Sequence, residues 1–225
     1  RYFRINKLKK NTYLIIDFDS TIISCETLDE LSRLLIDNNI KKINQIKDIT
    51  NKAMDGSIPF DKALNERLKI LSINHQSILD GIKLINSKIT NTFLENSQFI
   101  STNNNNIYIV SGGFSEFIRP VADILGFKSE HIFCNSFIRH KNNYELDERN
   151  IMAQNKGKVE VVKQLGLKGF TIVIGDGYTD YEIKKHGYAD LFIAYTEHEN
   201  RNKVSNLADY KSNSFTDILE YINSL

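Results

Sequence analysis

Three apolar segments, each followed directly by polar or glycine residues, constrain the fold of this chain more than any other feature. They cover residues 13–16, 107–110 and 170–174. Each is too short for a buried helix and is rich in the β-branched residues that are typical of buried strands. Because helical patterns separate them, they predict parallel strands covered on both faces. We therefore expect an α/β fold with a Rossmann-like parallel sheet, to which residues 191–195 add a strand.

The residues after these strands are predicted to meet at one edge of the sheet. They are Asp17-Phe18-Asp19, Ser111-Gly112-Gly113 and Gly175-Asp176-Gly177. Ligands of such sheets bind beyond the carboxyl ends of the strands. Glycines at that edge let the backbone approach a ligand closely. A dinucleotide-binding fingerprint is excluded, because Asp180 stands where its third glycine would be.

Asp17 and Asp19 end a buried strand, where unpaired carboxylates are costly. A hard cation such as Mg²⁺ would pair them. One carboxylate can then attack phosphorus while its neighbour handles a proton. A calcium loop is excluded, because Ile22 and Leu28 stand where it needs Gly and Glu. Two solvated acids at a strand end remain the alternative for this segment taken alone.

Lys156 opens a helical pattern that runs to Gly166. A lysine at a helix start is usually solvated. Its place shortly before the strand at 170–174 favours contact with a phosphate, whose charge it would neutralise.

These motifs, in this order, resemble the haloacid-dehalogenase superfamily of aspartate-nucleophile phosphatases over nearly the whole chain. The closer resemblance is to its phosphoserine phosphatase family. That resemblance includes the segments at 26–31, 53–60 and 63–68. Glu26, Met54 and Arg67 within them narrow the similarity to phosphoserine.

The resemblance implies a helical cap inserted between the first and second motifs. Residues 26–100 lack a clear strand and are predicted to form that cap, while 1–25 and 101–225 form the core. Within the core we expect a helix from 114 to 125, a β-hairpin within 132–147 and a helix from 216 to 222.

The resemblance also implies a mechanism. Asp17 attacks phosphorus and forms an aspartyl-phosphate, and Asp19 protonates the departing serine oxygen. Mg²⁺ is held by the Asp17 side chain, the Asp19 backbone carbonyl and Asp176.

The resemblance assigns the rest of the site as well. Ser111, the Gly112 amide and Lys156 hold the phosphate, and Asp180 orients Lys156 or a metal-bound water. The substrate contacts are assigned as follows: Glu26 to the amino group, Arg67 to the carboxylate, Met54 to the pocket wall and Thr179 to the amino-acid end. Tyr178 departs from the family pattern, in which a small residue is usual, and either narrows the entrance or faces the cap.

Composition excludes several other classes of partner. The 225 residues are 41% hydrophobic and 25% charged with a net charge of +1, which gives no electrostatic case for nucleic acid or membrane surfaces. Two cysteines, Cys25 and Cys134, fit a reducing compartment, so we expect a cytoplasmic protein. The chain begins at Arg1, so we expect a fragment, a processed product or the tail of a longer polypeptide.

Two other functions remain open. The first is a phosphatase or phosphotransferase of the same superfamily that acts on another small phosphomonoester. The second is a non-catalytic ligand-binding relative, against which the intact set of Asp17, Asp19, Lys156 and Asp176 argues.

Overall fold

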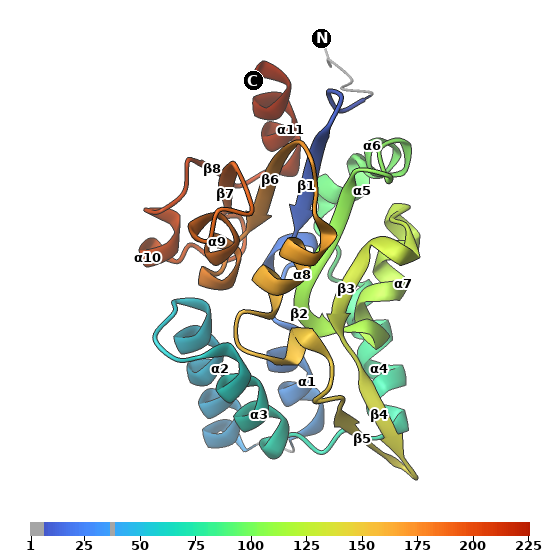
Figure 1. The fold of residues 1–225 in the computed structure, drawn as a ribbon. Helices are drawn as coiled ribbons and strands as arrows, with labels where there is room; N and C mark the ends of the chain where they lie inside the picture. Colours follow the sequence, from blue (N-terminus) through green and yellow to red (C-terminus); the bar gives the residue numbers. More distant parts are fainter. Residues whose placement is uncertain (1–6, 37–38) are drawn as a thin grey trace.

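A six-stranded parallel sheet forms the centre of the protein (Figure 1). The computed structural model describes residues 7–36 and 39–225. The strand order is β3-β2-β1-β6-β7-β8. The strands are β1 (Thr12–Ile16), β2 (Ile107–Phe114), β3 (Ile132–Asn135), β6 (Phe170–Gly175), β7 (Leu191–Tyr195) and β8 (Tyr210–Ser212). The α/β fold with a parallel sheet is therefore confirmed, and so are the four strands expected from the sequence.

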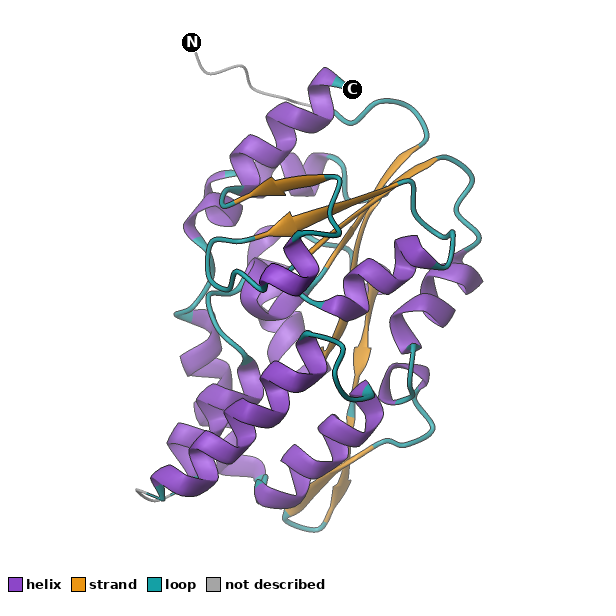
Figure 2. Cartoon of the chain, turned by 90° about the vertical axis from the view of Figure 1, so that its left-hand side faces the viewer, coloured by secondary structure: helices purple, strands orange, loops and turns teal. Residues whose placement is uncertain are grey.

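Both faces of the sheet are covered by helices, as Figure 2 shows. Successive side chains of a strand point to opposite faces, so Ile15 packs in one apolar layer and Leu14 and Ile16 in the other. One layer includes α8 (Gly157–Leu165) and α9 (Tyr178–Lys185). The other includes α7 (Ser115–Leu125) and α11 (Phe215–Ser224). The continuous apolar strands of the sequence follow from this double burial.

A group of helices lies at the carboxyl ends of the strands, in the lower half of Figure 1. They are α1 (Thr27–Leu35), α2 (Ile40–Met54) and α3 (Phe60–Ile70). We call α2, α3 and the residues between them, 40–70, the cover. α4 (His75–Asn86) packs on α7, α5 (Asn91–Glu95) contacts α11, and α6 (Ser97–Thr102) contacts α7. The division into a 26–100 cap and a two-segment core stays a prediction.

The segment at 132–147 contains the expected hairpin and one unexpected strand. β4 (Phe137–His140) and β5 (Asn143–Leu146) pair antiparallel, with Lys141 at φ 53° in the turn. Residues before them join the main sheet as β3. The remaining short elements are η1 (Phe18–Ile22), η2 (Ser129–His131), η3 (Ile151–Ala153) and α10 (Asn202–Ser205).

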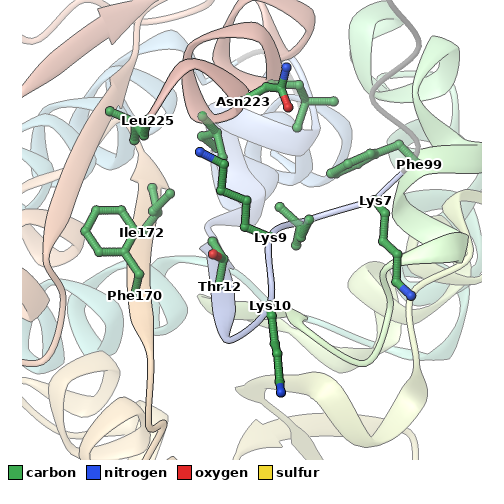
Figure 3. Close-up of a pocket in the computed structure, with 12 residues that line it drawn as sticks. Lys7, Lys9, Lys10, Thr12, Phe99, Phe170, Ile172, Asn223 and Leu225 are labelled. Atoms are coloured by element: carbon green, nitrogen blue, oxygen red, sulfur yellow. The ribbon is translucent and has the colours of Figure 1, made fainter.

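An apolar cavity of about 250 Å³ lies at the amino ends of β1 and β6. Figure 3 shows Thr12, Phe170 and Ile172 around it, with Leu225 from the end of the chain. It is at the opposite end of the sheet from Asp17. No helix in the described ranges, 7–36 and 39–225, is long and apolar enough to cross a membrane.

Candidate active site

The turn after β1 places two carboxylates beside one cavity. The backbone N–H of Asp17 donates to the Ile174 carbonyl of β6 (2.9 Å), which ties the residue after β1 to the neighbouring strand. Its Oδ1 accepts from the N–H of Phe18 (2.7 Å). Ser20, in the turn η1, has a φ of 52°, in the left-handed region. Such conformations cost energy and persist where the surrounding contacts enforce them, often at functional sites.

Asp19 is the second of these carboxylates. Its Oδ1 accepts from the N–H of Thr27 (3.0 Å) and from the Thr27 hydroxyl. Burial, with the charges of Glu26 and Asp17, raises the pKa of Asp19 to about 8 against the opposing hydrogen bonds from Thr27. Its Oδ2 faces Gly113, where a Cβ would lie only 3.2 Å away. The Asp19 carboxyl group therefore holds a proton near neutral pH and faces the second motif.

Three buried carboxylates form a cluster at the sheet edge. Oxygen atoms of Asp17, Asp176 and Asp180 lie within 4.8 Å of one another. Burial raises the pKa of Asp176 well above its ordinary value, and burial with the Asp17 charge raises that of Asp180 to about 7. Asp176 Oδ1 is buried without a hydrogen-bond partner among the described residues. A hard divalent cation would satisfy that oxygen, so the donor set fits a metal such as Mg²⁺.

Lys158, and not Lys156, is the lysine that pairs with Asp17 and Asp180 in this cluster. Its Nζ lies 2.8 Å from Asp17 Oδ1 and 2.8 Å from Asp180 Oδ1, and its side chain is 6% exposed. Burial would lower the pKa of Lys158, but the two carboxylates raise it above its usual value. The amine of Lys156 is exposed and lies 3.3 Å from His186 Nε2. The carboxylates are therefore contacted by Lys158 rather than by Lys156, which lines an adjacent small cavity with Gly112 and Thr179.

The start of α8 explains this difference. Lys156 precedes the helix at φ 60°, outside the helical region, whereas Lys158 is the second residue of the helix and lies on its buried face. Gly157 approaches the preceding turn so closely that a Cβ there would lie 2.5 Å from the Ile151 carbonyl oxygen. This tight approach directs α8 so that Lys158 faces the carboxylates.

The second motif forms a close-fitting surface opposite Asp17. Ser111 is buried, and its Oγ accepts from the N–H of Gly113 (3.1 Å). A Cβ on Gly112 would lie 2.3 Å from the ring of Phe60, which comes from the cover. A side chain at position 112 would therefore displace the Phe60 ring.

Glu26 and Arg67 are charged, buried and part of the same cavity. Glu26 Oε1 accepts from the Ser20 hydroxyl (2.9 Å). Arg67 Nη1 donates to Thr50 Oγ1 (3.1 Å), whose hydroxyl donates to Asp29 Oδ1 (2.7 Å). Burial lowers the pKa of Arg67, and the charges of Glu26 and Asp29 oppose the change.

The structure gathers the predicted substrate residues around one small cavity. It is lined by Asp17, Asp19, Glu26, Thr27, Leu28, Met54, Phe60, Arg67, Ser111, Gly112, Gly113, Phe114, Lys158 and Thr179. Its volume is about 20 Å³. The Thr179 hydroxyl is buried without a partner among the described residues. Tyr178 points to the cover, where a Cβ on Gly56 would lie 2.7 Å from its ring.

Sequence reasoning missed Arg201, a further charged residue of the site. Its guanidinium contacts Asp176 and Glu26, and its side chain is 8% exposed. The available signal was its position in the loop after β7, at the sheet edge where the three motifs meet. Polar loop residues of this kind are usually solvated, so that signal was weak.

The comparisons with known proteins agree with this geometry. Residues 12–185 match the haloacid dehalogenase-like hydrolase family. The chain is 33% identical over 214 residues to the chloroplastic phosphoserine phosphatase of Arabidopsis thaliana, covering 93% of this chain and 70% of that protein. It is 29% identical over 208 residues to the phosphoserine phosphatase of Homo sapiens, covering 90% and 89%.

Solved structures of phosphoserine phosphatases and related proteins also resemble this chain. A phosphoserine phosphohydrolase-like protein from Francisella tularensis subsp. tularensis SCHU S4 superposes with a TM-score of 0.85 and 37% identity, covering 94% of this chain and 99% of that one. A phospho-aspartyl intermediate analogue of phosphoserine phosphatase superposes with a TM-score of 0.78 and 25% identity, covering 95% and 99%. With its parallel sheet, its strand-end carboxylates and a family match over most of its length, the chain belongs to the haloacid dehalogenase-like hydrolases.

Proposed function

We propose that this chain is a phosphoserine phosphatase, which hydrolyses O-phosphoserine to serine and phosphate. One observation carries the proposal. The cavity that contains Asp17 and Lys158 is also lined by Glu26 and Arg67. Groups suited to a phosphate and groups suited to an amino acid therefore share one enclosed site. The named phosphatases to which the chain is similar support the same substrate.

The chemistry follows from the positions of the carboxylates. Asp17 attacks phosphorus as the nucleophile and forms an aspartyl-phosphate. Asp19 donates its proton to the departing serine oxygen and then takes a proton from the water that cleaves the intermediate. Such acid–base help typically contributes about 10²–10⁴-fold to the rate. Lys158, the Ser111 hydroxyl and the Gly112 amide hold the phosphate oxygens, and Asp180 orients Lys158.

A divalent cation, for which we propose Mg²⁺, would be held by the Asp17 side chain, the Asp19 backbone carbonyl and Asp176. When bound, it neutralises charge between the nucleophile and the phosphate. The oxygen-only donor set and the unpartnered Oδ1 of Asp176 support this choice over softer metals.

Recognition of the amino acid is assigned to the groups nearest the cover. Arg67 pairs with the substrate carboxylate, since its planar fork can bond both oxygens. Glu26 accepts from the substrate ammonium group. Met54 and Thr179 line the pocket at the same end. A role in serine biosynthesis and a cytoplasmic location belong to the same proposal.

The test is phosphate release from phosphoserine, phosphothreonine, phosphohomoserine and an aryl phosphate, with Mg²⁺ or with a chelator. Phosphoserine should have the highest kcat/KM, and chelation should abolish turnover. Mass spectrometry of trapped protein should place phosphate on Asp17. Preference for another phosphomonoester, or transfer to an added alcohol, would favour the second hypothesis, a different phosphatase or a phosphotransferase. Binding without turnover would favour a non-catalytic relative.

A further inference from the structure

Arg201 joins two parts of the site that the mechanism treats separately. It lies between β7 and α10, and its side chain is 8% exposed. Its Nε donates to Asp176 Oδ2 (2.9 Å), and its Nη2 donates to Glu26 Oε1 (3.1 Å). Asp176 belongs to the carboxylate cluster, and Glu26 belongs to the amino-acid end of the cavity. One guanidinium group therefore fixes the separation between them.

Arg201 bonds one carboxylate oxygen of Asp176 and one of Glu26, and leaves the second oxygen of each available for a ligand. Asp176 Oδ1 is buried and unpartnered among the described residues, so Arg201 occupies one oxygen and leaves the other for a cation. The hydrogen bonds that Glu26 accepts from Ser20 and Arg201 both use Oε1. Among the described residues no hydrogen bond reaches Oε2, which is left for an ammonium group.

The charge of Arg201 matters as well as its shape. Burial raises the pKa of Glu26, and Arg201 opposes that rise most strongly of the neighbouring charges. A carboxylate must be ionised to bind an ammonium group well. The planar guanidinium holds its donors in a rigid fork. A lysine amine at this position could not reproduce the spacing of the hydrogen bonds to Asp176 and Glu26.

The third arm of Arg201 reaches the cover. Its Nη1 donates to Asn51 Oδ1 (3.0 Å), in the last turn of α2. Lys203 binds the same part of the cover, with Nζ 2.9 Å from Asp55 Oδ2, but it is 69% exposed and contacts neither Glu26 nor Asp176. Substitution of Lys203 is therefore a matched control, because it removes a nearby positive charge and a contact to the cover but leaves Glu26 and Asp176 untouched.

We propose that Arg201 is the positioning residue for substrate specificity, holding Glu26 in place for the ammonium group of phosphoserine and using Asp176 as its fixed anchor. The inference rests on the proposed function. It predicts that Arg201 acts through Glu26, and so affects substrates with an amino group more than substrates without one.

The measurement is the ratio of kcat/KM for phosphoserine to kcat/KM for 3-phosphonooxypropanoate, which is phosphoserine without its amino group. Arg201→Gln should lower this ratio about tenfold, because a charged hydrogen bond that positions Glu26 is lost. Arg201→Lys keeps the charge and should also lower it. Lys203→Gln should leave it unchanged. The dissociation constant of L-serine, measured by calorimetry with Mg²⁺ present, should rise in the two Arg201 variants and stay unchanged in Lys203→Gln.

A double-mutant cycle separates positioning from general damage. In the Glu26→Gln background, Arg201→Gln should not lower the ratio further. Equal losses for both substrates, or a ratio in Arg201→Lys equal to that of the wild type, would overturn the inference. A wild-type enzyme that prefers neither substrate would instead contradict the proposed recognition by Glu26. Arg201→Lys keeps the test decisive if Arg201→Gln fails to fold.

Discussion

At the scale of single residues, Lys158 has the most demanding position in the site. It is shared between two buried carboxylates, each 2.8 Å from its amine. Without it, Asp17 and Asp180 face one another unpaired, and the phosphate loses a cation. Lys156, two residues earlier, offers a comparison within the chain, because it precedes α8 and its amine lies on the surface beside His186.

Lys158→Ala should lower kcat by about 10²–10³-fold, the usual cost of removing one charge-stabilising group from an active site. Lys156→Ala should change kcat little, because its amine lies on the surface beside His186. Steady-state kinetics on phosphoserine measure both, with circular dichroism to verify folding. Equal losses would contradict this assignment of the cation.

Arg67→Ala should impair phosphoserine hydrolysis far more than hydrolysis of an aryl phosphate, which has no carboxylate to bind. The lost contact is a charged hydrogen bond in an enclosed site, so the ratio of the two kcat/KM values should fall by at least about tenfold. Lys69→Ala, on the same helix α3, is the control. A ratio that did not move would remove Arg67 from the recognition set.

At the scale of elements, the cover is held by contacts that only glycine permits. Gly56 has a φ of +78°, and a Cβ there would lie 2.7 Å from the Tyr178 ring. Tyr178 in turn accepts from the Lys185 amine (2.9 Å). Of the two orientations expected for Tyr178, the structure therefore shows the one that packs against the cover.

Gly56→Ala should raise the KM for phosphoserine, because the added methyl group pushes α9 and the cover apart. Gly187→Ala is the matched control, since its φ is +80° and nothing lies within 4 Å of its Cβ. Both substitutions should cost about 1–2 kcal/mol of backbone strain in thermal unfolding. Gly56→Ala should cost more because of its contact with Tyr178, and it alone should change KM. Tyr178→Ala in the Gly56→Ala background should restore it. Identical kinetics for the two alanine variants would exclude this contact from cover closure.

The predictability of these elements depends on how local their causes are. The strand at 170–174 could be predicted because a strand that is buried on both faces has a continuous apolar sequence. β8 was missed because a three-residue edge strand, Tyr210–Ser212, carries too little apolar pattern. The choice between Lys156 and Lys158 depended on where α8 begins, which Gly157 sets by packing against another turn. Arg201 is defined by tertiary contacts alone.

At the scale of the whole molecule, the buried carboxylates link folding to pH. The pKa of Asp19 is raised to about 8 and that of Asp180 to about 7, from an ordinary value of 3.8. Across this window the folded protein keeps protons that the unfolded chain has lost. The free energy of unfolding of the metal-free protein should therefore fall as pH rises from about 4 to 8.

Thermal unfolding in a chelator should accordingly show a lower Tm at about pH 8 than at about pH 5.5. Added Mg²⁺ should raise Tm more at the higher pH, where the carboxylates that bind it are ionised. Asp176→Asn should reduce both effects. A chelated protein with a higher Tm at the higher pH would contradict the direction of these pKa shifts.

The small cavity described above has a kinetic consequence. A volume of about 20 Å³ holds roughly one water molecule, so neither phosphoserine nor serine can pass while the cover is in place. Each catalytic cycle should therefore include a movement of the cover, residues 40–70, that opens the cavity to solvent. Where that movement limits turnover, kcat should decline in proportion to the viscosity of added sucrose. The rate-limiting step would then be the opening of the cover, in which Phe60 separates from Gly112.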